Sequence, residues 1–83
     1  MCWYVRIHIK LKKDVLDAQG KATYKALLAL GFHNVQDVRI GKLIELQIEN
    51  NSRTEVEIQV KDMCQRLLAN PVIEDYVYTI EEY

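Results

Sequence analysis

The chain has little of what marks several classes of protein. It has one proline, three glycines, and no internal repeat or low-complexity stretch that could serve as a linker. A chain of 83 residues cannot divide its apolar side chains between two cores, so we expect one domain over residues 1–83. The two cysteines, Cys2 and Cys64, lack C-x-x-C spacing, and we expect free thiols and no disulfide.

Long apolar runs are also missing. Arg6 interrupts the first apolar stretch before it could act as a signal-peptide core or a membrane-spanning helix. We therefore expect a cytoplasmic protein that does not enter a membrane. Eleven basic and twelve acidic residues give a net charge of −1, which disfavours binding to nucleic acid.

No motif for catalysis or nucleotide binding is present: the sequence has no G-x-x-x-x-G-K-[ST], no G-x-G-x-x-G and no H-E-x-x-H. Cys64 falls in an apolar helical stripe and Cys2 lies near the chain end, so neither is placed beside a base. His8 and His33 lack clustered companions that could complete a metal site. We predict no catalytic, cofactor-binding or metal-ligating residue in this chain.

The first half of the chain reads as a strand, a helix and a hairpin. Strict alternation over residues 4–11 is typical of a half-buried strand. Asp17 is placed to cap a helix that runs to about Leu30, and Gly31 can take the left-handed conformation that ends it. Two β-type runs, 35–40 and 43–49, flank Gly41-Lys42, which suits a type II′ hairpin.

The second half reads as a helix followed by a strand. Ser52-Arg53-Thr54-Glu55 is a capping box that starts the helix, and Asn70-Pro71 ends it. Its apolar stripe is expected to contain Val56, Val60, Met63, Cys64 and Leu67. A last strand follows at about 73–81. This order predicts an α+β fold: a ferredoxin-like β-α-β-β-α-β two-layer sandwich, with a four-stranded antiparallel sheet and two helices on one face.

Some apolar residues would remain outside that core. On the first helix, Ala22, Ala26 and Leu30 are expected to face the sheet, whereas Tyr24 and Leu28 would form a patch on the opposite side.

The second helix and the last strand add to this surface. Ile58 faces away from the apolar stripe of the second helix. Tyr76 and Tyr78 share one face of the last strand, and we expect them on the open face of the sheet, in contact with another protein. The candidate interface therefore consists of Tyr24, Leu28, Ile58, Tyr76 and Tyr78.

Three strings are more specific when read together: KKDVLDAQGKA at 12–22, VRIGK at 38–42 and LLANPVIEDY at 67–76. In order and spacing they resemble the PurS family, the small subunit of phosphoribosylformylglycinamidine (FGAM) synthase, over essentially the whole chain. The family pattern usually has a glycine where this chain has Asp14 and a proline where it has Ala18. Alanine is a good helix former and aspartate tolerates unusual dihedrals, so both differences are mild.

The resemblance implies a non-catalytic accessory subunit in de novo purine biosynthesis. The complex is a ligase that converts formylglycinamide ribonucleotide, glutamine and ATP to FGAM. This chain would bridge a glutaminase subunit and a large synthetase subunit and assist ammonia transfer between them. ATP and Mg would bind the synthetase, not this chain, and the family likeness implies a homodimer or homotetramer.

Three other functions use a similar fold. A ferredoxin-like regulatory domain that binds a ligand, an amino acid, between paired domains is the main alternative. An RNA-binding module would need an RNP1 pattern and a basic surface, and both are missing. An acylphosphatase-like hydrolase would need an arginine and an asparagine in a phosphate loop, and residues 14–20 contain neither.

Overall fold

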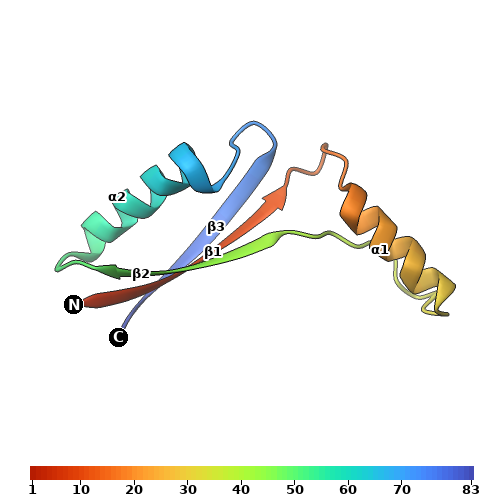
Figure 1. Cartoon of the computed structure of the whole chain (residues 1–83), viewed down its shortest axis with the longest axis horizontal. Coiled ribbons are helices and arrows are strands. Elements are labelled where there is room, and N and C mark those ends of the chain that lie inside the picture. The colour runs from red at the N-terminus through yellow and green to blue at the C-terminus, as the bar shows by residue number, and fades with distance from the viewer.

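The alternating residues at the start of the chain form the central strand of the structure. The computed structural model describes residues 1–83. Its elements are β1 (Cys2–Leu11), α1 (Ala18–Ala29), β2 (Lys42–Glu49), α2 (Arg53–Met63) with a π-helical extension η1 (Cys64–Leu68), and β3 (Glu74–Glu82) (Figure 1). No helix is long and apolar enough to cross a membrane.

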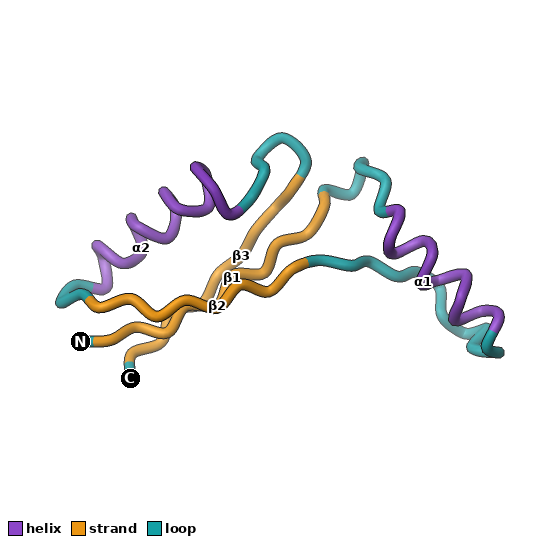
Figure 2. Tube along the Cα trace, viewed as in Figure 1, coloured by secondary structure: helices purple, strands orange, loops and turns teal.

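The sheet has three strands, in the order β2-β1-β3, and both pairings are antiparallel. The expected four-stranded sheet is therefore wrong. Residues 35–40 are extended but lie beyond the end of the sheet (Figure 2). The chain runs from them into β2 without reversing, so the Gly41-Lys42 hairpin is also wrong. Gly41 is needed there for another reason: a Cβ would lie 2.4 Å from the carbonyl oxygen of Ile9.

The two helices do not share a face of the sheet, which is a second departure from the expected sandwich. α2 lies over one face, whereas α1 projects away from the end of the sheet (Figure 1). The molecule measures 51 × 28 × 14 Å, and its radius of gyration is 16.4 Å. About 12 Å is typical of a compact domain of this length. The projecting α1 causes the difference.

The core lies between α2 and the covered face of the sheet. Alternate residues of β1 are buried there, as the sequence pattern predicts, and meet the buried side of α2. The cluster is Trp3, Val5, Ile7, Ile9, Val56, Val60, Cys64, Ala69 and Ile80. No residue of 12–41 belongs to it, so α1 gains no support from this core.

Helix α2 begins at its expected cap, where the Ser52 side chain accepts a hydrogen bond from Glu55 N at 3.3 Å. In a complete capping box the Glu55 side chain would accept a hydrogen bond from Ser52 N. Here Asn50 Oδ1 accepts that hydrogen bond instead, at 3.0 Å. The capping box is therefore only half formed.

The end of α2 differs from the predicted stripe because of the π-helical turn. Ala69 N donates to the carbonyl oxygen of Cys64, five residues earlier, at 3.0 Å. One extra residue in the turn rotates the following side chains relative to an α-helix. As a result Leu68 packs against the core, while Leu67, predicted to be in the stripe, is 83% exposed.

Candidate interaction site

We call residues 12–41, which contain α1 and project from the sheet, the arm, and the remaining residues the body. Two hydrogen bonds to Asp17 hold the root of the arm. Its Oδ1 accepts from Gly20 N and its Oδ2 from Ile40 N, both at 2.8 Å. The hydrogen bond from Ile40, together with that from Gly20, lowers the pKa of the buried Asp17 carboxyl below its ordinary value. Asp17 therefore caps α1 and joins it to the returning segment.

Arg39 provides a second brace at the root. Its Nη2 donates to the carbonyl oxygens of Leu11 and Lys12 at 3.0 and 3.1 Å. Lys12 also pairs with Asp75 of β3 at 2.8 Å. These contacts tie the base of the arm to the ends of β1 and β3, and they set the direction in which α1 leaves the sheet.

Within the arm, the orientation of α1 is the reverse of the expected one. Tyr24 and Leu28 of α1 are half-buried. The chain that follows α1 runs back alongside this helix toward β2 (Figure 2). Ala22, Ala26 and Leu30, expected to face the sheet, are exposed. The structure thus places Tyr24 and Leu28 inside the arm and leaves a small-residue face of α1 outward.

The tyrosines of β3 lie on the covered face of the sheet. Strand pairing places Tyr76 opposite Ile9 and Tyr78 opposite Ile7, and both tyrosines are partly buried against the core. Their expected position on the open face is wrong. Because β3 also carries the apolar Val77 between them, alternation alone could not identify the covered face.

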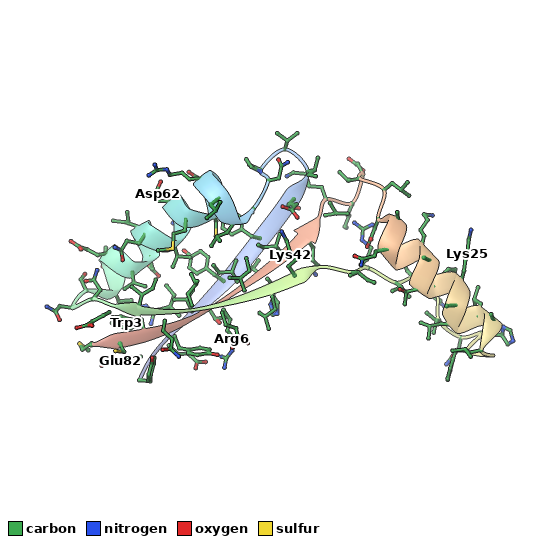
Figure 3. All side chains as sticks on the ribbon, viewed as in Figure 1. Trp3, Arg6, Lys25, Lys42, Asp62 and Glu82 are labelled. Atoms are coloured by element: carbon green, nitrogen blue, oxygen red, sulfur yellow. The ribbon has the colours of Figure 1, made fainter.

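On the open face of the sheet, the side chains of the central strand β1 are largely polar. Arg6 lies there, on the side away from α2 (Figure 3). It pairs with Glu45 at 3.9 Å and Glu81 at 3.6 Å, and its guanidinium lies 4.7 Å from the Tyr4 ring centroid. The Tyr4 hydroxyl also donates to Glu45. These charged side chains pair with one another while remaining exposed to solvent.

An apolar groove lies beside α2. It has a volume of about 380 Å³ and is lined by Leu46, Asp62, Met63, Arg66, Leu67 and Leu68. Ile58, the one member of the candidate interface on α2, is 63% exposed. Leu67 was missed as a surface residue because regular helical spacing places it in the core, and only the π-helical turn turns it outward.

The groups capable of chemistry are not brought together. No three His, Cys, Asp or Glu side chains are close enough to hold a metal ion. Cys64 is fully buried, and burial raises the pKa of its thiol, which reduces the fraction of reactive thiolate. Cys2 lies on β1, at the far end of the sheet from the arm.

The fold and these surfaces define a class: a small α+β protein whose distinctive features are a projecting arm and an exposed apolar groove. Such features serve contact with other protein chains.

Known proteins narrow this class to one family. The PurS family, described as phosphoribosylformylglycinamidine (FGAM) synthase, matches residues 4–82. The synthase subunit PurS of Bacillus subtilis is 51% identical over 78 residues, covering 94% of this chain and 92% of that protein. The subunit PurS of Methanocaldococcus jannaschii is 45% identical, covering 89% of each chain.

Solved structures of PurS proteins support the same assignment. The structure of B. subtilis PurS has a TM-score of 0.88 at 50% identity and covers 96% of this chain and 99% of that one. A chain in the structure of PurLQS from Thermotoga maritima has a TM-score of 0.90 at 27% identity, covering 98% and 99%. The chain therefore belongs to the PurS family, as the sequence resemblance predicts, and the regulatory ligand-binding alternative is not supported.

Proposed function

We propose that this chain is the accessory subunit of a phosphoribosylformylglycinamidine synthase complex, an ATP-dependent, glutamine-using ligase of purine biosynthesis. The observation that carries the proposal is the identity to PurS subunits over nearly the whole chain. The PurLQS structure of T. maritima contains a similar chain in a larger complex.

The role we assign is bridging. The chain would join a glutaminase subunit to a large synthetase subunit and assist the transfer of ammonia between them. ATP and Mg would bind the synthetase. This division suits a chain whose cysteines and histidines are dispersed, and which exposes apolar side chains on the arm, on α2 and its extension, and on the open face of the sheet at Leu43 and Val77.

We further propose that the chain is cytoplasmic and self-associates as a homodimer or homotetramer. Only 11 of its 83 residues are buried. A core this small is commonly supplemented by oligomerisation.

Reconstitution tests the proposal. The glutaminase and synthetase from the same organism would be assayed for FGAM formation with and without this chain. We expect glutamine-dependent turnover only when all three are present, together with co-elution of the two untagged partners with a tagged chain.

The same assay with ammonium salt in place of glutamine separates bridging from catalysis. A bridging subunit should be needed much less when ammonia is supplied directly. Equal glutamine-dependent turnover without the chain would refute the proposal.

A further inference from the structure

One cross-strand row on the open face of the sheet combines a basic side chain with exposed apolar side chains. Strand pairing places His8 of β1 between Leu43 of β2 and Val77 of β3, so the three side chains are neighbours on one face. Leu43 is 50% exposed and Val77 is 64% exposed. They are the only aliphatic side chains that the three strands place on this face. The exposed aliphatic surface of the open face is therefore concentrated in the His8 row.

A pocket of about 370 Å³ lies over this row. It extends to Lys10, Gly41 and Lys42, at the end of the sheet nearer the arm, and no carboxylate lines it. Gly41 leaves space for the lysine stem, because a Cβ at this position would lie 3.0 Å from Lys10 Cγ. Pockets of about 300–1,000 Å³ are large enough to hold a ligand or a few side chains. The pocket is therefore both basic and partly apolar.

Two of the basic side chains in this pocket have no partner within the chain. His8 and Lys10 make no ion pair and no side-chain hydrogen bond. Asp75 lies opposite Lys10 on β3, but its carboxylate pairs with Lys12 at 2.8 Å. Arg6, on the same face, has two carboxylate partners. The pocket thus offers unpaired donors beside apolar surface.

We propose that this pocket is a docking site for a segment of a partner subunit of the synthase, one that presents an aspartate or glutamate beside an apolar side chain. The carboxylate accepts hydrogen bonds from Lys10 Nζ and from the imidazole of His8, which carries an N–H in either protonation state. The apolar side chain covers Leu43 and Val77. This inference rests on the proposed bridging function and assigns a surface to it.

The chemistry of the occupant follows from charge complementarity. A basic or neutral segment would bury Lys10 without a partner, which is unfavourable, whereas a carboxylate satisfies it. A standard interface buries about 800 Å² on each partner, which is more than three side chains supply. The His8 row is therefore the anchor of a wider contact, and the paired Arg6 and Glu45 belong to its polar rim.

Lys10→Glu tests the charge, and Lys61→Glu is the matched control. Lys61 is also exposed and makes no ion pair, but it lies on α2, which covers the opposite face of the sheet. Each variant is titrated into the glutaminase and synthetase subunits until glutamine-dependent turnover saturates. We expect Lys10→Glu to raise the half-saturating concentration at least tenfold and Lys61→Glu to change it less than about twofold. Turnover at saturation should be unchanged, and Lys10→Arg should stay close to the wild type.

A second pair of variants tests the apolar part of the pocket without changing charge. Val77→Ser alters the His8 row, and Val72→Ser makes the same change in the turn before β3, at a residue that is 78% exposed. We expect Val77→Ser to raise the half-saturating concentration about fivefold or more, and Val72→Ser to leave it within about twofold. Circular dichroism checks the fold, and Val77→Thr keeps the β-branched side chain if the serine variant is unstable. Equal effects of Val77→Ser and Val72→Ser would contradict the proposal.

Direct capture distinguishes failure of this inference from failure of the proposed function. If the wild type supports turnover, but Lys10→Glu saturates at the same concentration, only the docking site is wrong. If Lys10→Glu weakens capture of a partner subunit by the tagged chain, but the wild type supports no turnover, only the proposed function is wrong. If Lys10→Glu weakens self-association in analytical ultracentrifugation and leaves capture unchanged, a second copy covers the row and the inference is overturned.

Discussion

Gly20 provides a sharp test of how the arm is held, because two physical effects predict opposite results for Gly20→Ala. In an ordinary helix, alanine is more stable than glycine by about 1 kcal/mol. At this position, however, a Cβ would lie 2.5 Å from Asp17 Oδ2 and 2.5 Å from the carbonyl oxygen of Val38. Both are closer than any real contact.

Neither neighbour can move freely. Val38 O belongs to the backbone, and Asp17 Oδ2 accepts the hydrogen bond from Ile40 N. Forcing a methyl group into a filled site costs about 1–3 kcal/mol. Because the obstacles are held, we take the upper part of that range and expect a net loss of about 1–2 kcal/mol. That loss would increase the open population of the arm about 5- to 30-fold.

Native-state hydrogen exchange measures this loss locally. In Gly20→Ala, the amides of residue 20 and of Ile40 should exchange about 5- to 30-fold faster. The amides of Ile7 and Val60 in the core should change little, because the arm contributes nothing to the core cluster.

Gly31→Ala is the matched control. Gly31 has φ +99° and no atom within 4 Å of a Cβ, so alanine there is strained but not crowded. We expect faster exchange at the end of α1 and none of the effect at Ile40. Slower exchange at Ile40 in Gly20→Ala, or a higher melting temperature, would mean that helix propensity dominates and that the packing argument is wrong.

Three further predictions follow from other contacts. Because the pKa of Asp17 is lowered in the folded protein, its contribution to arm stability is complete above the unfolded-state pKa and is lost as the pH falls through the lower folded-state pKa. Protection of the Ile40 amide from hydrogen exchange should therefore fall in strong acid, and Asp17→Asn should remove this pH dependence. An unchanged pH profile in Asp17→Asn would contradict the role of this carboxylate. Leu68→Ala should lower the free energy of unfolding by about 1–3 kcal/mol, since Leu68 packs on the core. Leu67→Ala should change the free energy of unfolding by less than about 0.5 kcal/mol in dilute monomer. Urea titrations measure both, and equal effects would mean that the π-helical turn does not decide which of the two leucines faces the core. In the folded protein Cys2 should react with a thiol reagent well before Cys64, because Cys64 is buried and its thiol pKa is raised. The double variant Cys2→Ser/Cys64→Ala should retain synthase activity once it is shown to fold. Loss of turnover with normal assembly of the complex would indicate a chemical role for a thiol.

Local signals in the sequence determined several elements correctly. The alternation of β1 identifies its buried residues, because successive side chains of a strand point to opposite faces. Asp17 and Ser52 mark the starts of the two helices, since their side chains bind nearby backbone amides. Gly31 follows the first helix with a positive φ. These features depend on neighbours a few residues away.

The candidate interface was harder to predict because exposure depends on distant parts of the chain. Ile58 is exposed as expected, since α2 has a clear buried stripe. The sequence places Tyr76 and Tyr78 on the wrong face, because β3 has apolar residues on both sides. Alternation shows which residues share a face, and only the position of α2 shows which face is covered.

What the sequence by itself determined was the family, the caps and the buried side of the central strand, because these depend on residue order and short-range geometry. The tertiary structure alone decided the direction of α1, the role of residues 35–40 and the exposure of Leu67. Residues 35–40 have strand-like composition, yet the Ile40 amide binds Asp17, 23 positions away, and Arg39 binds the end of β1. Such long-range bonds are invisible to local patterns, and they turn a segment that favours a β-strand into the returning side of an arm.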